Sequence, residues 1–186
     1  MPLIESTVET LRADIAAGPS PLFVVFSSKP GADGKPWCGY CVKAEPDIER
    51  VFAGEPYGLI VRYGPEDITT DANWVFDAWR LPGVPAIYRV VDGEPALHTT
   101  YEEPFGPELD AYVDSPDAWE AYLRSKEGDK YQPAEARAAA HAAEFEKIKV
   151  LIAEYKAKEA ARKTAEEGKA PAAAAVCTGD VCVVPS

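Results

Sequence analysis

The chain has 186 residues, of which 47% are hydrophobic, enough for one domain with a buried core and an extension. Its formal net charge of −12 argues against nucleic acid and against an anionic membrane surface, so we expect neither as a partner. The charge is uneven, because residues 1–132 carry 11 Lys and Arg against 23 Asp and Glu, whereas residues 133–170 carry 8 against 7. This contrast indicates an acidic globular part followed by a separate, nearly neutral module.

The beginning of the chain, Met1 to Glu5, lacks the basic and apolar segments of a secretory signal. A run of about eighteen apolar residues, which a transmembrane helix needs, does not occur. With no such signal, the four cysteines indicate reduced or catalytic thiols rather than a secreted disulfide framework. We therefore expect a cytoplasmic location.

The first part of the chain begins with a short strand, expected at Leu3-Ile4. A helix follows, predicted from the capping-box pattern Ser6-Thr7-Val8-Glu9 and ended by Gly18-Pro19. The apolar run over 22–26 predicts a strand that is covered on both faces. A Gly/Pro-rich connection over 28–36 leads to the first cysteine pair.

Helices and strands continue to alternate up to about residue 125. The predicted elements are a helix over 38–53, a strand over 59–61, a short helix over 74–79, strands over 86–91 and 96–101, and a helix over 107–125 that is broken at Ser115-Pro116. Asp92-Gly93, between the last two strands, is typical of a tight antiparallel hairpin. The fold class is therefore α/β, with a central mixed sheet flanked by helices on both faces.

Residues 133–170 are rich in Ala, Glu and Lys. An apolar stripe at helical spacing predicts an amphipathic helix that packs in cis or dimerises; it consists of Phe145, Ile148, Ile152 and Tyr155. The last residues have no apolar partner of their own, which predicts a flexible tail. The expected organisation is a domain over 1–130, the amphipathic helix over 131–170 and the tail over 171–186.

Cys38 and Cys41 stand three residues apart at the start of a predicted helix. The N-terminus of a helix presents unpaired N–H groups and the positive end of the helix dipole, which favour a thiolate at Cys38. Cys41 lies one turn further on the same face, within reach of a disulfide. We therefore expect a redox couple in which Cys38 is the exposed nucleophile and Cys41 resolves the mixed disulfide.

Other interpretations of this cysteine pair remain open at this point. Half of a zinc site would need two more ligands, and His98 and His141 are not spaced like the histidines of a zinc finger. Cys177 and Cys182 are spaced more widely than the cysteines of a zinc knuckle. We predict no metal site, because the position after a strand and at a helix start favours redox chemistry over zinc or an inert pair.

Several motifs, in the correct order, resemble the thioredoxin superfamily: Trp37-Cys38-Gly39-Tyr40-Cys41, Pro46 in the following helix, Gly83-Val84-Pro85 before a strand, and Asp92-Gly93-Glu94 in a hairpin. Within it, the closest resemblance is to the family of thioredoxin domain-containing protein 17. The lengthened loop over 27–35 and the run from Cys41 to Pro46 are similar to that family. The likeness covers about residues 5–125 and does not extend to the tail.

The resemblance implies a thioredoxin-like fold and a protein-disulfide reductase, with Trp37, Tyr40, Val84 and Pro85 binding substrate beside Cys38. It also implies a cis peptide bond at Pro85, which would turn the Val84 backbone toward the substrate. We expect no bound cofactor, with electrons coming from NADPH through thioredoxin reductase, or from glutathione. The expected partners are one of these reducing systems and disulfide-containing proteins or small molecules.

Two of the departures of the sequence from the family pattern concern the dithiol site. The strand before the motif, Phe23–Ser28, has no acidic residue, whereas thioredoxin has one there for proton handling, so the group that activates Cys41 is left open. Tyr40 makes the motif similar to that of glutaredoxin, although Val90–Glu94 lacks a glutathione-binding pattern. A glutathione-dependent, glutaredoxin-like oxidoreductase is therefore one alternative, and a non-enzymatic metal-binding or adaptor protein on the same fold is another.

The second cysteine pair flanks Thr178-Gly179-Asp180-Val181, a turn-forming sequence that can bring the sulfurs of Cys177 and Cys182 together. One hypothesis is an auxiliary redox pair on a tethered arm that exchanges electrons with Cys38 and Cys41. The alternatives are two unrelated surface thiols or a stable staple at the end of the chain.

Overall fold

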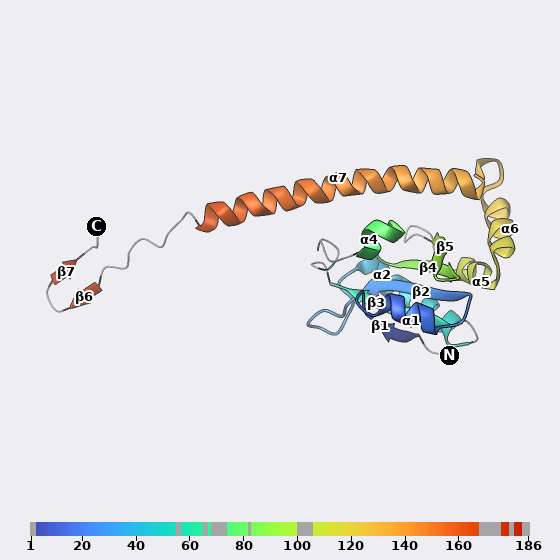
Figure 1. The fold of residues 1–186 in the computed structure, drawn as a ribbon, viewed down its shortest axis with the longest axis horizontal. Coiled ribbons are helices and arrows are strands. Elements are labelled where there is room, and N and C mark those ends of the chain that lie inside the picture. The colour runs from blue at the N-terminus through green and yellow to red at the C-terminus, as the bar shows by residue number, and fades with distance from the viewer. Residues whose placement is uncertain are drawn as a thin grey trace. The chain divides into compact units, whose positions relative to one another are not determined.

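Figure 1 shows the computed structural model of the chain, which describes residues 3–54, 57–64, 67, 74–81, 83–99, 106–167, 176–178 and 181–183. The chain divides into two compact units, Met1–Phe145 and Glu146–Ser186. No helix among the described residues is long and apolar enough to cross a membrane.

The first unit is built on a five-stranded sheet in the order β1-β3-β2-β4-β5. Its strands are β1 (Ile4–Ser6), β2 (Leu22–Ser28), β3 (Gly58–Tyr63), β4 (Ala86–Val91) and β5 (Glu94–Thr99). Strand β3 runs parallel to both β1 and β2, whereas β4 is antiparallel to β2 and to β5. The predicted mixed sheet is therefore confirmed. So is the hairpin at Asp92-Gly93, where both residues have the positive φ, 52° and 86°, that a tight hairpin turn requires.

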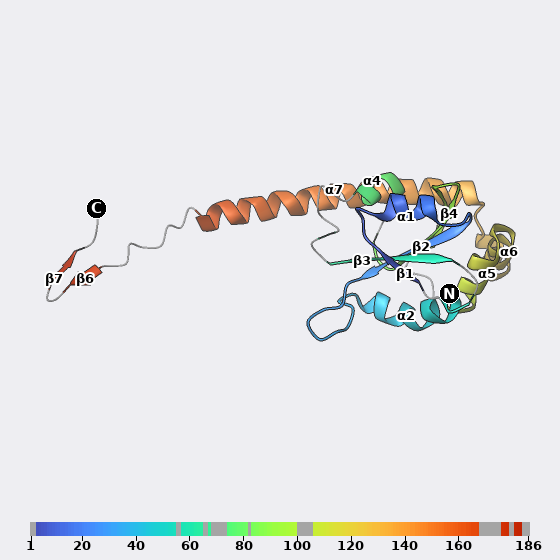
Figure 2. The ribbon, with the colours of Figure 1, turned by 60° about the horizontal axis from the view of Figure 1, so that its bottom comes forward.

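Helices cover both faces of this sheet (Figure 2). They are α1 (Leu11–Ala17), α2 (Gly39–Phe52), α4 (Trp74–Trp79), α5 (Gly106–Asp114) and α6 (Pro116–Glu127), the last followed by a short 3-10 helix, Gly128–Lys130. Helices α1 and α4 pack on one face, and α2, α5 and α6 on the other. Strand β2 is buried along its whole length, with alternate side chains in the two cores, so it is the centre of the domain.

Helix α7 (Ala134–Glu167) confirms the predicted long helix. Phe145, on its apolar stripe, is 2% exposed and packs against Phe76 of α4 at a ring-centroid distance of 4.8 Å. Tyr155, at the other end of the stripe, is 58% exposed. The first turns of α7 thus belong to the first unit, while the module boundaries at residues 130 and 170 stay a prediction.

Ser6 does not cap a helix, contrary to the capping-box prediction. It is the last residue of β1, in register with Val61 of β3, and α1 begins only after Thr10. The Ser6 hydroxyl donates instead to the Asp14 carboxylate, 2.6 Å away. Pairing with β3 holds the Ser6 backbone in the sheet, and this tertiary constraint overrides the local helix-start signal.

The predicted connection over 28–36 starts one residue too early. Ser28 is the last residue of β2, in register with Tyr63, and Ser27 pairs with Arg62, so both serines continue the strand. Both are buried. The structure also contains a cis bond at Ser20-Pro21, which was not predicted from the sequence.

One buried hydroxyl supports strand β4 where its register with β5 shifts, between Arg89 and Val90. Tyr112 of α5 is fully buried, and its hydroxyl donates to the Ile87 carbonyl at 2.9 Å. The same hydroxyl accepts from the Arg89 backbone N–H at 2.8 Å. One side chain thereby satisfies two backbone groups at the irregular place in the sheet.

We expect Tyr112→Phe to lower the free energy of unfolding by roughly 1–3 kcal/mol, because a buried backbone group loses its partner. Urea unfolding of the whole chain measures the change. Tyr155→Phe removes the same hydroxyl from an exposed ring and serves as the control, with a change within about 0.5 kcal/mol. Equal stability losses in the two variants would show that the Tyr112 hydroxyl does not support the sheet.

Candidate redox site

Cys38 and Cys41 lie where α2 starts, after the loop that follows the central strand. Cys38 is the N-cap residue of α2, with extended backbone, and its carbonyl accepts the first helical hydrogen bond from the Val42 N–H at 3.1 Å. Cys41 is in the first turn. The predicted helix start and the predicted spacing of the two thiols on it are confirmed.

The two thiols differ in exposure. Cys41 is 1% exposed and belongs to the core between the sheet and α1 and α4, whereas Cys38 is half-buried. Tyr40, between them, is 55% exposed, and Trp37 is 42% exposed. Of the pair, only Cys38 is a partly exposed residue that a substrate can reach.

A segment distant in sequence faces Cys38. The peptide bond between Val84 and Pro85, immediately before β4, is cis, as the resemblance implied. The Cys38 thiol donates to the Val84 carbonyl at 3.3 Å. The fold therefore brings the predicted substrate-binding backbone of Val84 next to the predicted nucleophile.

Trp37 is held in place by its ring nitrogen. Its Nε1–H donates to the Tyr63 carbonyl at the end of β3, 2.8 Å away, and the Lys29 N–H donates to the same carbonyl at 2.7 Å. The loop between Lys29 and Trp37 closes on itself through a bridge between Pro30 and Pro36. This loop fixes Trp37 beside Cys38 with part of its ring exposed.

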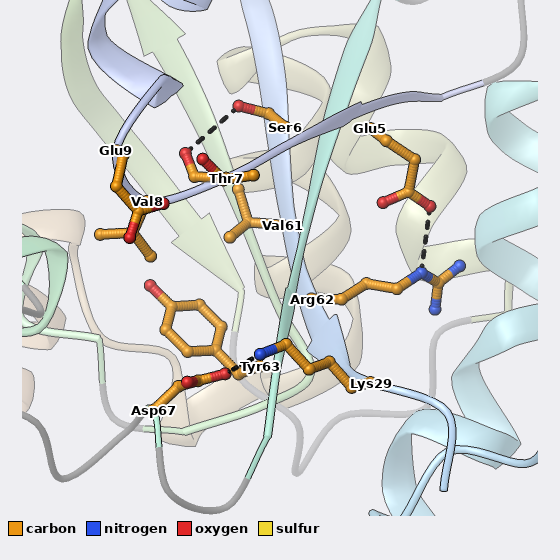
Figure 3. Close-up of a pocket in the computed structure, with 10 residues that line it drawn as sticks. All are labelled: Glu5, Ser6, Thr7, Val8, Glu9, Lys29, Val61, Arg62, Tyr63 and Asp67. Atoms are coloured by element: carbon orange, nitrogen blue, oxygen red, sulfur yellow. Dashed lines mark hydrogen bonds and ion pairs between the residues drawn. The ribbon is translucent and has the colours of Figure 1, made fainter. Parts of the chain in front are cut away.

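A pocket of about 320 Å³ lies at the carboxyl ends of β1 and β3 (Figure 3). Four of its charged side chains form two ion pairs, Lys29 with Asp67, and Arg62 with Glu5 at 3.2 Å. Neither cysteine of the α2 motif lines it. The dithiol is therefore separate from this pocket.

The electrostatics of the site centre on Cys41. Burial raises the pKa of its thiol, because desolvation penalises the thiolate. The hydroxyls of Ser28 and Ser27 and the Ser28 backbone N–H act in the opposite direction and lower this pKa, because they can donate hydrogen bonds to the thiolate. Neither serine was predicted to have a role, although two small polar residues that extend an apolar strand toward a cysteine pair were a usable signal.

Other predicted residues lie elsewhere. Cys177 is in β6 (Val176–Thr178) and Cys182 is in β7 (Val181–Val183), both in the second unit, and their side chains are outside the described part of the structure. The His98 side chain is likewise not described. Among the residues that are described, no three His, Cys, Asp or Glu side chains form a group able to hold a metal ion.

The strand order and the dithiol that faces a cis proline place the chain in the class of thioredoxin-fold thiol–disulfide oxidoreductases. The family model described as "Thioredoxin domain-containing protein 17-like, thioredoxin domain" matches residues 4–98, about half of the chain. The chain belongs to this family, as the resemblance indicated. No curated protein matches the chain at a significant level.

Solved structures with a similar fold include thioredoxin f from spinach chloroplast, at 18% identity and a TM-score of 0.46, over 61% of this chain and 95% of that one. Mitochondrial thioredoxin 3 from Saccharomyces cerevisiae, in the oxidised form, is 14% identical with a TM-score of 0.44, over 60% and 93%. The oxidoreductase DsbH is 13% identical with a TM-score of 0.43, over 64% and 85%.

In the reduced protein, iodoacetamide at about pH 6 should modify Cys38 before Cys41. Cys41 is buried and its raised pKa leaves less thiolate at any pH below that pKa. Mass spectrometry of a chain carrying Cys177→Ser and Cys182→Ser measures the order of labelling. Faster modification of Cys41 would reverse the assignment of the two thiols.

Proposed function

We propose that the chain is a protein-disulfide reductase in which Cys38 is the nucleophile and Cys41 the resolving thiol. The Cys38 thiolate attacks one sulfur of a substrate disulfide, whose S–S bond breaks, and the first substrate thiolate leaves and takes a proton from water. Cys41 then gives its proton to water and attacks Cys38 Sγ, the bond from Cys38 to the substrate sulfur breaks, and the second substrate thiolate leaves and takes a proton from water. Two electrons pass to the substrate, and Cys38–Cys41 becomes a disulfide.

The observation that carries this proposal is the unequal exposure of two adjacent thiols on one helix turn. An exposed sulfur can be reached by a large substrate, and a buried one can be reached only from within the site, by its neighbour. This is the arrangement that a two-step exchange needs. The Val84 carbonyl next to Cys38, with Trp37 and Tyr40 exposed on either side, supports a role of these residues and of Pro85 in substrate binding.

The proposal includes a reducing system that returns Cys38–Cys41 to the dithiol. We propose that the electrons come from NADPH through thioredoxin reductase and that this chain binds no cofactor. We also propose a cytoplasmic location, in which that reducing system operates. Because Tyr40, at the third position of the motif, makes it similar to that of glutaredoxin, glutathione is the alternative reductant. The acidic surface, with a net charge of −12, supports protein or small-molecule disulfides rather than nucleic acid as partners.

We expect Cys38→Ser to abolish reduction of a disulfide substrate such as insulin. We expect Cys41→Ser to attack the substrate once and to remain attached to it as a mixed disulfide, because nothing resolves the bond. Turnover is followed with NADPH and thioredoxin reductase and, in parallel, with glutathione and glutathione reductase. The trapped species is identified on non-reducing gels and by mass spectrometry.

Tyr155→Phe, at an exposed ring of α7 to which no role in the site is assigned, is the matched control and should retain the full turnover. Full activity of Cys38→Ser would contradict the proposal. Rapid turnover with glutathione alone would replace the thioredoxin reductase assignment with the glutaredoxin-like one. Stoichiometric zinc in anaerobically purified protein, with both thiols blocked, would favour the metal-binding alternative.

We propose in addition that Cys177 and Cys182 form an auxiliary redox pair. Strands β6 and β7 are antiparallel, with Cys177 directly opposite Cys182 and Thr178 opposite Val181. The Cα atoms of directly opposite residues in such a pair lie about 4.5–5.5 Å apart. Disulfides span Cα distances of about 4.4–6.8 Å, so this register suits a cross-strand bond. The oxidant is a disulfide, either Cys38–Cys41 or oxidised glutathione, which takes up the two electrons.

We expect peptide mapping of the oxidised chain to show a Cys177–Cys182 disulfide. In the Cys41→Ser variant, a bond from Cys38 to Cys177 or Cys182 within one chain would demonstrate exchange between the two pairs. Turnover should then fall when residues 171–186 are deleted and, equally, in a full chain with both tail cysteines changed to serine. Unchanged turnover in both variants, with no such bond, would leave the tail thiols without a role in the reaction.

A further inference from the structure

Strand β2 ends with a backbone donor that the sheet does not use. Successive residues of β2 face β3 and β4 in turn, and the Lys29 N–H donates to the Tyr63 carbonyl of β3. The N–H of Ser28, one residue earlier, therefore points to the β4 side. The ladder with β4 has already ended there, because its last pair is Phe26 with Ala86.

The Ser28 side chain is in an unusual position for a hydroxyl. It is fully buried, and the alternation along β2 places it on the same face as Phe26, whose core cluster includes Cys41. Among the residues that the structure describes, Ser28 Oγ has no hydrogen-bond partner of acceptable geometry. An unpaired buried hydroxyl lowers the stability of the folded protein. We therefore expect another state of the site in which this hydroxyl has a hydrogen-bond acceptor.

That state is the thiolate of Cys41. A neutral thiol is a weak hydrogen-bond acceptor, whereas a thiolate is a strong one, and a hydroxyl hydrogen can rotate to meet it. Burial raises the pKa of Cys41, and hydrogen bonding from Ser28 and, less strongly, from Ser27 lowers it. Strand β2 carries no carboxylate that could act in their place.

We propose that Ser28 stabilises the Cys41 thiolate during the resolving step, through its hydroxyl and its backbone N–H. The inference rests on the proposed function, because it concerns the second half of the same exchange. Ser28 donates hydrogen bonds and takes no proton. The proton of Cys41 goes to water, the new bond joins the sulfurs of Cys41 and Cys38, and the bond from Cys38 to the substrate sulfur breaks.

The test uses the full chain with Cys177→Ser and Cys182→Ser, so that Cys38 and Cys41 are the only thiols. Mixing the reduced protein with 5,5′-dithiobis(2-nitrobenzoate) releases one thionitrobenzoate when Cys38 is modified and a second when Cys41 resolves the mixed disulfide. The two phases are followed separately by stopped flow over a range of pH.

Ser28→Ala should slow the second phase roughly tenfold at neutral pH, the effect of losing one hydrogen bond to a charged group. Removal of the donor raises the pKa of Cys41 further, so the rise of this rate with pH should move to higher pH by about one unit. The first phase should not change, because Ser28 acts on Cys41 and not on Cys38. Ser27→Ala should produce a smaller displacement in the same direction.

Stability separates this role from a structural one. Ser28 Oγ has no hydrogen-bond partner of acceptable geometry among the described residues of the dithiol form. Ser28→Ala should therefore leave the urea midpoint of the reduced protein unchanged or slightly higher. Ser6→Ala is the matched control, since it removes another buried strand-end hydroxyl, one that is bonded to Asp14 and not to a cysteine. It should leave both kinetic phases unchanged.

Several results would overturn the inference. They are an unaltered second phase in Ser28→Ala, an equal slowing of both phases, or a clear loss of stability in the reduced variant. If the parent chain itself released only one thionitrobenzoate, the two-thiol function would fail as well. A parent that resolves normally, with Ser28→Ala indistinguishable from it, would remove only the role of Ser28.

Discussion

Strand β2 is hydrogen-bonded to β3 to its last residue, but its ladder with β4 stops at Phe26 and Ala86. Before Ala86, the chain passes through the cis bond between Val84 and Pro85, and the Val84 carbonyl is taken by the Cys38 thiol instead of by a strand. The first turn of α2 thus meets the sheet where one ladder ends. If the sheet continued, its strands would hydrogen-bond the backbone groups at this point to each other. Because the ladder ends here, the Val84 carbonyl can accept a hydrogen bond from the Cys38 thiol.

The same constraint separates the two cysteines. A helix that starts at the end of a central, fully covered strand has its N-cap at the surface and its first inward residue in the core. Cys38 and Cys41, three positions apart, therefore experience different solvation, and burial raises the pKa of Cys41. A buried thiolate requires hydrogen-bond donors, and Ser28 and Ser27 at the end of β2 lower the pKa of Cys41.

The part of the chain after Phe145 differs from the first unit in its contacts and in its balance of charged residues. Phe145 packs against Phe76 and ties the first turns of α7 to the first unit, whereas the residues from 146 onward form a unit of their own. The nearly neutral composition of residues 133–170 is consistent with this change, since an acidic globular surface is not continued there. The antiparallel register of β6 and β7 places the second cysteine pair within that unit alone.

Much of this architecture follows from local pattern in the sequence. The apolar run of β2, the hairpin signal Asp92-Gly93 and the break at Ser115-Pro116 were sufficient for the strands, the edge hairpin and the division between α5 and α6, because each depends on residues close together in the chain. The cysteine spacing at a helix start likewise predicted the dithiol. The tertiary structure alone decided that Ser6 joins a sheet instead of capping a helix, since pairing with β3 is a long-range interaction.

It also decided that the two residues after Phe26 are buried strand residues beside Cys41. Ser27 and Ser28 look like the start of a polar loop, and only their pairing with β3 in a sheet covered on both faces removes them from water. Burial and partners depend on what the rest of the chain places around a side chain. A local pattern cannot encode them, and for that reason the sequence determined the dithiol while the fold determined its surroundings.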